Sequence, residues 1–479
     1  MDVGRVRVPG GADGPPNFVA WLREHPYLAA FLVGSVVMAV LVFRKKTTEF
    51  EWAYVLTARH LVDGRGIYGL DFPPFRSFTY PPFMALLSIP FAYMPKYAGR
   101  GAWYLVNLAS LLVVWRGSWK LAGGGRLEGP DPGRIDRREH LVAVFGLACA
   151  LPYLQSGVAH QQTDLLITAL LIAGCLALRR SRGFLAATSF GLAAGMKCTP
   201  LLWAPYLAWR GRWKAAAWLV AVAVGVNLLP NLVSVPKGGG WWALEWFERF
   251  LRPMGASTYL PGQWYAWILD NQSLAGTFTR LATTRFAWQA DGLAILDRSS
   301  PLGAGMLRPL IYGVEAALLL VAWYALRRRR PIPACLAGEP GSTRDAIEYG
   351  MVLMLMLLFS PMSSRPHFAT MLLPALCLAR LAVYGKRVVL SRLLHATIAT
   401  SLLSLPFLGR SVGRLTMWGG VLTWGASFLL LGCLWVLLAG TRKGEGPGRN
   451  HLPGRGDASG AAGPHGVLVS GQKAAETAS

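Results

Sequence analysis

Long apolar runs constrain this chain more than any other feature of its sequence. A helix of about 20 apolar residues spans the hydrocarbon core of a bilayer, and runs near that length recur through most of the 479 residues. We place these runs near residues 27–43, 101–119, 140–157, 163–179, 184–196, 199–209, 214–232, 306–326, 346–361, 367–384, 388–408 and 416–440. They predict an all-α polytopic membrane protein with about 12 transmembrane helices.

The composition supports a membrane protein and explains an unusual charge. Hydrophobic residues make up 53% and charged residues 15% of the chain, whereas a soluble protein carries about 25% charged residues. A net charge of +24 in a soluble chain would indicate nucleic acid binding. In a membrane protein the same excess arises from cytoplasmic loops and from contact with anionic lipid. We therefore expect membrane lipids as partners and no nucleic acid.

The apolar run at 81–94 determines the predicted orientation. It is shorter than a span and bounded by prolines, which favours a helix in the membrane interface over a crossing. Basic clusters such as Arg327 to Arg330 then face the cytoplasm, as the positive-inside rule requires. We expect a cell-membrane protein with both termini in the cytoplasm and outer loops at about 44–100 and 233–305.

This orientation divides the chain into three parts. Residues 1–26 form a cytoplasmic N-terminal lead, and residues 27–440 form the transmembrane domain. Residues 441–479 are rich in Gly, Ala, Ser and Pro and lack apolar periodicity, which predicts a disordered cytoplasmic tail.

Polar clusters at the outer ends of the helices are the candidate functional residues, because an ionisable group in a bilayer is costly without a partner or a function. Glu49 and Glu51 follow the first helix beside Arg44. A carboxylate there could act as a general base, and the cation could hold a lipid phosphate. The alternative is an amphipathic interfacial helix whose charges face water, which the spacing alone favours.

Two further clusters lie in the middle of the chain. Gln162 and Asp164 open an apolar helix, and Asp164 alone would be read as an ordinary helix cap. Lys197 lies between two apolar runs at the outer face. It is either a snorkelling lysine or a ligand for phosphate.

The last clusters lie in outer segments near the C-terminal half. Asn271 follows an aromatic segment, and Arg365 and His367 lie in a turn between two spans. Arg365 could hold a phosphate, and His367 could donate to it or shuttle a proton. The alternative is a hydrated turn. No cluster of Asp, Glu and His predicts a metal site, and no cofactor is required.

Short motifs follow one another in a distinctive order. They are an acidic-Phe pair after the first helix, Leu61-x-x-Gly64-x-Gly66-Ile67-Tyr68, Tyr80-Pro81-Pro82, Gln162-x-Asp164, Gly191 to Lys197 with Pro200, Asn271-Gln272-Ser273-Leu274, and Ser360-Pro361 followed by His367. In this order the chain resembles glycosyltransferase family 87, the polyprenol-phosphate-mannose-dependent membrane mannosyltransferases of the GT-C superfamily. The resemblance covers roughly residues 27–440.

The resemblance implies a GT-C-type bundle with a juxtamembrane first outer loop, a polyprenyl-phosphate sugar donor and a lipid or glycan acceptor. The family uses an Asp as base in the first outer loop, and Glu49 takes the matching position, with Glu51 as the alternative. On this hypothesis the base deprotonates an acceptor hydroxyl, and a single displacement inverts the anomeric carbon. The residues that would hold the donor phosphate are Lys197, Arg365, Arg44 and His367, and those that would bind sugar or acceptor are Tyr80, Gln162, Asp164 and Asn271.

Two other functions are compatible with a polytopic chain. A transporter or lipid-linked sugar flippase would also contain intramembrane ionisable groups and broken helices, but no inverted repeat is visible. A noncatalytic scaffold would leave the polar clusters unexplained. We therefore expect a hexosyltransferase, with mannose as the expected sugar.

Overall fold

The computed structural model describes residues 24–69, 78–127, 136–255, 268–289, 292–297, 304–328, 342–405 and 409–439. The chain divides into two units, Met1–Thr441 and Arg442–Ser479. All described residues belong to the first unit. The predicted disordered tail and most of the predicted N-terminal lead lie outside the described residues.

Each predicted apolar run coincides with a helix. These helices are α2 (Pro26–Phe43), α6 (Lys96–Leu121), α7 (Arg137–His160), α8 (Asp164–Arg179), α9 (Gly183–Met196), η3 (Thr199–Leu202) with α10 (Trp203–Trp209), α11 (Trp213–Ser234), α14 (Ala304–Arg327), α15 (Ser342–Phe359), η7 (Arg365–Met371) with α16 (Leu372–Tyr384), α17 (Val388–Leu403) and α19 (Val421–Ala439). Within the described ranges, six helical segments are long and apolar enough to cross a membrane. The protein is therefore a multi-pass helical protein, and the count of about 12 crossings stays a prediction.

Shorter helices connect the long ones. They are η1 (Phe50–Val55), α3 (Leu56–Val62), α4 (Phe83–Leu87), α5 (Ile89–Ala92), η4 (Val235–Lys237), α12 (Trp242–Trp246), η5 (Phe247–Leu251), η6 (Arg252–Gly255), α13 (Leu274–Thr283) and α18 (Arg410–Trp418). The run at 81–94 forms α4 and α5, which have 5 and 4 residues. Neither is long enough to span a bilayer.

A β-hairpin departs from the all-helical prediction. Strands β1 (Thr284–Gln289) and β2 (Gly292–Asp297) pair antiparallel, with Phe286 opposite Ile295. The Phe286 ring packs edge-on against Trp418 of α18, with ring centroids 5.5 Å apart. An alternation of six residues is too short to stand out in a chain dominated by apolar helical runs.

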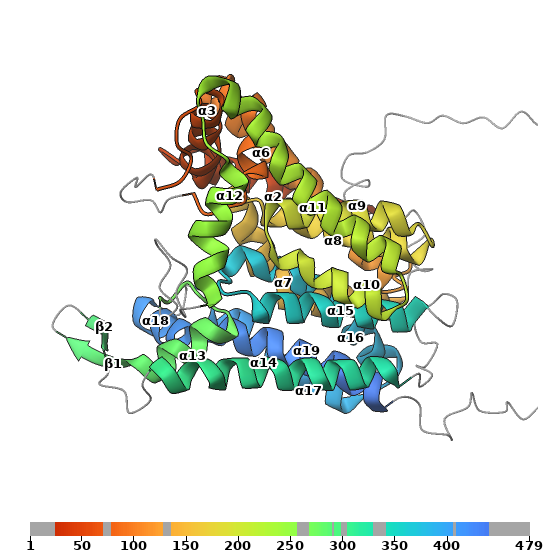
Figure 1. Cartoon of the computed structure of the whole chain (residues 1–479). Helices are drawn as coiled ribbons and strands as arrows, with labels where there is room; N and C mark the ends of the chain where they lie inside the picture. Colours follow the sequence, from red (N-terminus) through yellow and green to blue (C-terminus); the bar gives the residue numbers. More distant parts are fainter. Residues whose placement is uncertain are drawn as a thin grey trace, which may run out of the picture. The chain divides into compact units, whose positions relative to one another are not determined.

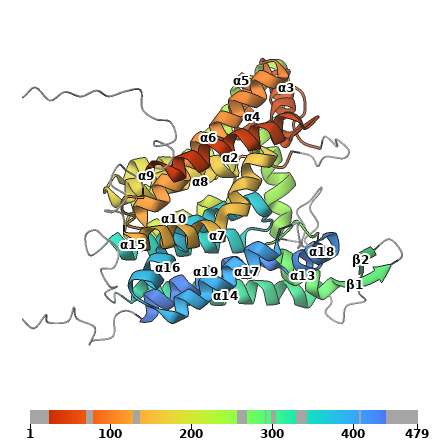
Figure 2. The ribbon, with the colours of Figure 1, turned by 180° about the vertical axis from the view of Figure 1, so that it is seen from behind.

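Helix α16 forms the centre of the bundle. Every residue from Leu372 to Leu381 is buried, as expected for a helix that is apolar on all sides. It contacts α6, α7, α15, α17 and α19, while α8 lies between α6 and α9, and α9 packs on α11. Figures 1 and 2 show these long helices side by side, with the hairpin and α18 at one end of them.

A buried ion pair joins α7 to this central helix. The Arg380 guanidinium donates to both Glu139 carboxylate oxygens, at 2.7 and 2.5 Å. The Tyr384 hydroxyl and the Gly125 amide also donate to Glu139, at 2.6 and 2.9 Å. Both charged groups are almost completely buried. Each therefore needs the opposite charge beside it to compensate for the loss of hydration.

Replacing one partner of this pair should therefore destabilise the bundle. We expect Arg380→Met to lower the free energy of unfolding by about 3–5 kcal/mol, since it leaves a buried carboxylate unpaired. The double variant Glu139→Met/Arg380→Met should recover most of this loss. Thermal unfolding in detergent micelles measures both effects, and an unchanged transition for Arg380→Met would contradict the role of the pair.

Candidate active site

A cavity of about 700 Å³ lies where several helix ends meet. Its walls come from the segment between α2 and α6, the segment after α9, the α12–η5 segment, the turn before α13 and the turn between α15 and η7. Of the ten residues predicted for the site, five line this cavity: Glu49, Tyr80, Gln162, Lys197 and His367. The structure thus brings together residues that lie more than 300 positions apart in the sequence.

Glu49 lies at the N-terminal end of η1, and a short exposed segment separates η1 from α2. The Tyr80 hydroxyl donates to its Oε1 at 3.2 Å, and the Gln162 side-chain amide donates to its Oε2. The Tyr54 hydroxyl in turn donates to the Tyr80 hydroxyl at 3.1 Å. These contacts fix the Glu49 carboxyl in one orientation toward the cavity.

The surroundings of Glu49 tune its acidity. Burial, the largest cause, raises the pKa of the Glu49 carboxyl to about 7, and the Asp164 carboxylate acts in the same direction. The hydrogen bonds from Gln162 and Tyr80 lower that pKa, as does the positive charge of Lys197. A carboxyl with a pKa near neutral is suited to accept a proton in a reaction at neutral pH.

A tight turn between α7 and α8 positions Gln162 and Asp164. Gln161 ends α7 in the left-handed conformation, with φ of 54°, which few residues other than glycine adopt. Its carbonyl accepts a hydrogen bond of 2.7 Å from the Trp103 indole, which holds the turn in place. The side chain of Gln162 then reaches the cavity, and Asp164 begins α8.

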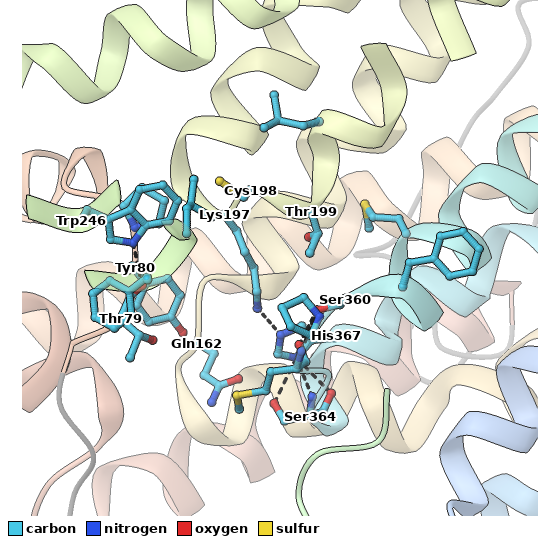
Figure 3. A pocket seen from close by; sticks show the side chains of 18 of the residues that line it. Thr79, Tyr80, Gln162, Lys197, Cys198, Thr199, Trp246, Ser360, Ser364 and His367 are labelled. Carbon is cyan, nitrogen blue, oxygen red and sulfur yellow. Dashed lines mark hydrogen bonds between the residues drawn. The ribbon is translucent and has the colours of Figure 1, made fainter. Parts of the chain in front are cut away.

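Lys197 follows the last residue of α9 and adopts an extended backbone. Its Nζ lies 2.9 Å from the Asp164 Oδ1, contacts the His367 Nε2 and lies 5.9 Å from the centre of the Tyr80 ring. Figure 3 shows the Lys197 side chain reaching toward His367. The lysine is therefore paired inside the protein, and it does not snorkel to water.

Contacts with Ser364 and Lys197 determine how His367 faces the cavity. The His367 Nδ1 lies 3.0 Å from both the carbonyl and the hydroxyl oxygen of Ser364 and 3.1 Å from its backbone nitrogen. The Lys197 ammonium has only N–H donors, so the Nε2 that it contacts accepts, and the proton of the neutral ring lies on Nδ1, toward the Ser364 carbonyl. Nε2 also lies 3.7 Å from the Asp164 Oδ1. His367 and Asp164 thus hold the lysine together.

Glu51 has a different environment from Glu49. It does not line the cavity. One carboxylate oxygen lies 2.5 Å from the Nε of the fully buried Arg100, and the other accepts from the amide and hydroxyl of Thr48, at 2.5 and 2.6 Å. Through these contacts both Glu51 oxygens hold the segment after α2 against α6.

The other predicted residues lie near the cavity or away from it. Asp164 is buried behind Lys197. Arg365 donates to the Ser404 carbonyl, and Arg44 lies exposed at the end of α2. Asn271 is buried and donates to the Pro361 carbonyl at 3.0 Å. Arg44, Arg365 and Asn271 do not line the cavity.

Several cavity residues were not predicted to act in the site. Trp52, Trp246 and Phe250 form aromatic walls. Asp270 directly precedes the predicted Asn271 and adds a second carboxylate. The spacing of Trp242, Trp246 and Phe250 at intervals of four indicates one face of a helix, although these residues lie in the loop predicted at 233–305.

Comparisons with known proteins identify the family of this chain. The sequence model of glycosyltransferase family 87 matches residues 78–361. A polyprenol-phosphate-mannose-dependent alpha-(1-2)-phosphatidylinositol pentamannoside mannosyltransferase of Mycobacterium tuberculosis is 34% identical over 164 residues, which are 33% of this chain and 35% of that protein. A protein of the same description from Mycolicibacterium smegmatis is 26% identical over 391 residues, which are 78% of this chain and 79% of its own.

A third relative is named for a related acceptor. It is the polyprenol-phosphate-mannose-dependent alpha-(1-2)-phosphatidylinositol mannoside mannosyltransferase of Mycobacterium tuberculosis, 28% identical over 270 residues. The match covers about a third of the pentamannoside mannosyltransferase of Mycobacterium tuberculosis and just over half of the second protein from that organism. The family model contains Tyr80, Gln162 and Lys197 of the cavity and covers more than half of the chain. The resemblance predicted from the motifs is confirmed, and this chain belongs to glycosyltransferase family 87.

Proposed function

We propose that this protein is a membrane mannosyltransferase that moves mannose from a polyprenyl-phosphate donor to a hydroxyl of a lipid or glycan acceptor. Membership of glycosyltransferase family 87 and the names of the relatives support this function. The observation that carries it is the joint presence of Glu49, Lys197 and His367 in one cavity. A base and a cation that donates to the phosphate are the groups that such a transfer needs.

Glu49 acts as the general base in this proposal. Its carboxylate takes the proton of the acceptor hydroxyl, and that oxygen forms a bond to the anomeric carbon of the donor sugar. The bond between the anomeric carbon and the phosphate oxygen breaks, and the electron pair leaves with the polyprenyl phosphate. A single displacement of this kind inverts the anomeric carbon. Gln162 and Tyr80 hold the carboxylate in position.

The Lys197 ammonium stabilises the leaving phosphate, and His367 positions it. The His367 Nε2 accepts from the ammonium, and both groups face the same part of the cavity. The lysine can therefore donate a further N–H to the oxygen on which negative charge develops. Asp164 pairs with Lys197 and keeps its ammonium directed at this point. Glu51, Arg44, Arg365 and Asn271 have no part in the chemical step that we propose.

The charge of the helix connectors supports a site at the outer membrane face. The cavity lies at the start of α8 and at the end of α9. The opposite ends of these two helices are joined by the basic connector Arg179 to Arg182, which the positive-inside rule assigns to the cytoplasm. We therefore propose a cell-membrane protein of the GT-C type, with about twelve crossings and both termini in the cytoplasm.

Sugar transfer by isolated membranes tests the proposed function directly. Membranes that contain the protein should move radiolabelled mannose from polyprenyl-phosphate-mannose to a lipid or glycan product, and membranes without it should not. Accumulation of labelled sugar in sealed vesicles without a new glycoside bond would support a transporter instead.

The two acids of the first outer loop should respond differently to the same substitution. We expect Glu49→Gln to fold normally and to lower kcat by about 10²- to 10⁴-fold, since it removes the general base. Glu51→Gln should leave the turnover of the folded protein nearly intact and lower its thermal stability, because Arg100 loses its carboxylate partner. Activity and thermal unfolding are measured on both variants. Loss of turnover in a stable Glu51→Gln protein would reverse the assignment.

The activity should rise with pH through the pKa of Glu49. The carboxyl is protonated and inactive below about pH 7 and ionised above it, so kcat/KM should reach a plateau on the alkaline side. Gln162→Leu removes a hydrogen bond that favours the carboxylate, and it should move the acidic limb of the profile to higher pH. An identical limb in wild type and Gln162→Leu would count against Glu49 as the titrating base.

Removal of the Lys197 charge should slow the departure of the polyprenyl phosphate leaving group. We expect Lys197→Met to lower kcat by about 10²- to 10³-fold. Lys237→Met is a matched control, because Lys237 donates to the Val62 carbonyl at 2.6 Å and does not line the cavity. The double variant Asp164→Asn/Lys197→Met should regain stability without regaining activity. Recovery of activity in that double variant would show that the cation itself is dispensable.

A further inference from the structure

The turn at residues 268–273 is held more firmly than a connection between helices requires. Arg280 of α13 is completely buried. Its guanidinium donates to the carbonyls of Ile268 and Asn271, both at 2.8 Å, and to the carbonyl of Trp418 at 2.8 Å. It also donates to the Thr277 hydroxyl at 3.4 Å. A buried guanidinium that donates mainly to backbone carbonyls indicates that the position of this turn matters.

The polar side chains of the turn are used in the same way. The Asn271 Oδ1 accepts from the amides of Ser273 and Ser363, at 3.2 and 3.3 Å. The Gln272 side-chain amide donates to the Met417 carbonyl at 2.7 Å, and its backbone N–H donates to the Ser363 carbonyl at 2.7 Å. Asn271, Gln272 and Ser273 are all buried. Their polar groups fix the turn and are not available to a ligand.

Asp270 is the exception in this turn. Its side chain is exposed and lines the cavity. Among the residues that the structure describes, none forms an ion pair or a hydrogen bond with the Asp270 carboxylate, and Arg280 and Arg365 interact with it only through their charge. Four buried polar side chains thus hold the turn, while Asp270 has no hydrogen-bond partner within the described part of the chain and lines the cavity.

We propose that Asp270 binds the acceptor, by accepting hydrogen bonds from two adjacent hydroxyl groups of an uncharged sugar or polyol. This inference rests on the proposed transferase function and names the class of acceptor. An ionised carboxylate offers two acceptor oxygens and no donor, so it requires donors from the ligand. Two neighbouring hydroxyls supply them in a bidentate arrangement, and hydrogen bonds to an ionised group are stronger than those between neutral groups.

The charges of the cavity favour an uncharged group at Asp270. Among the described residues that line the cavity, Lys197 is the only lysine or arginine, and Asp164 already lies 2.9 Å from it. The donor phosphate would use this cation. The nearest other cations, Arg280 and Arg365, do not line the cavity and donate to backbone carbonyls. A second phosphate, carried by the reacting end of the acceptor, would therefore meet the Asp270 carboxylate without a cation free to bind it, and like charges repel. Asp270 therefore selects for hydroxyls and against phosphorylated ends.

Binding of defined mannosides tests this inference without turnover. The probes are octyl α-mannoside, its monodeoxy analogues and octyl α-mannoside 6-phosphate. The signal is the change in tryptophan fluorescence on binding, to which Trp52 and Trp246 of the cavity contribute. In the wild type, two monodeoxy analogues with adjacent missing hydroxyls should bind about 10- to 100-fold more weakly than octyl mannoside. Asp270→Ala should weaken the binding of octyl mannoside by a similar factor. In this variant octyl mannoside and those two analogues should bind with equal affinity.

The variants offer controls for charge and for folding. Asp270→Asn should improve binding of the 6-phosphate relative to wild type, because the repulsive charge is gone. Glu245→Ala removes a carboxylate that pairs with Arg249 at 3.4 Å and does not line the cavity, and it should bind every probe as the wild type does. Since the Asp270 side chain holds no part of the turn, its variants should unfold at the wild-type temperature.

The possible results separate the two proposals. If Asp270→Ala binds octyl mannoside as tightly as wild type and keeps the preference over the deoxy analogues, the assignment of Asp270 is wrong. If the binding results are as expected but no mannose is transferred from polyprenyl-phosphate-mannose, the proposed function fails and the binding site stands. If transfer occurs, the kcat/KM for octyl mannoside should fall in Asp270→Ala while the KM for the donor is unchanged.

Discussion

The ion pair between Asp164 and Lys197 holds the candidate site together. Asp164 is the first residue of α8, and Lys197 follows the last residue of α9, so the pair joins the ends of two neighbouring helices. His367 contacts the same lysine from the turn after α15. Both charged groups are largely buried. Either of them without the other would be strongly unfavourable in this environment. The floor of the cavity is therefore a polar junction between three segments that are far apart in the sequence.

The bilayer explains why much of this junction could be predicted from the sequence. Spanning helices satisfy their own backbone groups and carry apolar side chains, so ionisable residues concentrate where helices end. Gln162, Lys197 and His367 each flank an apolar run, and the alternation of inward and outward loops assigned all three to one side. The boundaries of the runs agree with the helices to within a few residues in most cases.

Which side chains pair with one another could not be predicted in this way. Glu49 and Glu51 lie two residues apart, and on a helix such residues point in nearly opposite directions. Which of them faces the cavity depends on Arg100, which lies 49 positions further along and takes Glu51 as its partner. Asn271 has the side chain of a substrate-binding residue, yet its amide is used for backbone groups. The sequence contains no signal for either outcome, because both depend on tertiary contacts.

The distribution of charge in the cavity fits the reaction that we propose. Although the chain carries a net charge of +24, the described cavity lining contains Lys197 with the acids Glu49 and Asp270, and no arginine. When mannose is transferred, Glu49 takes up a proton and loses its charge, while the phosphate loses its ester bond to the sugar and gains a negative charge. The total charge in the cavity is unchanged. One negative charge moves from the Glu49 carboxylate to the phosphate beside Lys197 and His367. A single cation held in place by Asp164 and His367 therefore meets the charge where it develops, whereas a site filled with cations would bind the phosphate equally well before and after the reaction and would not accelerate it.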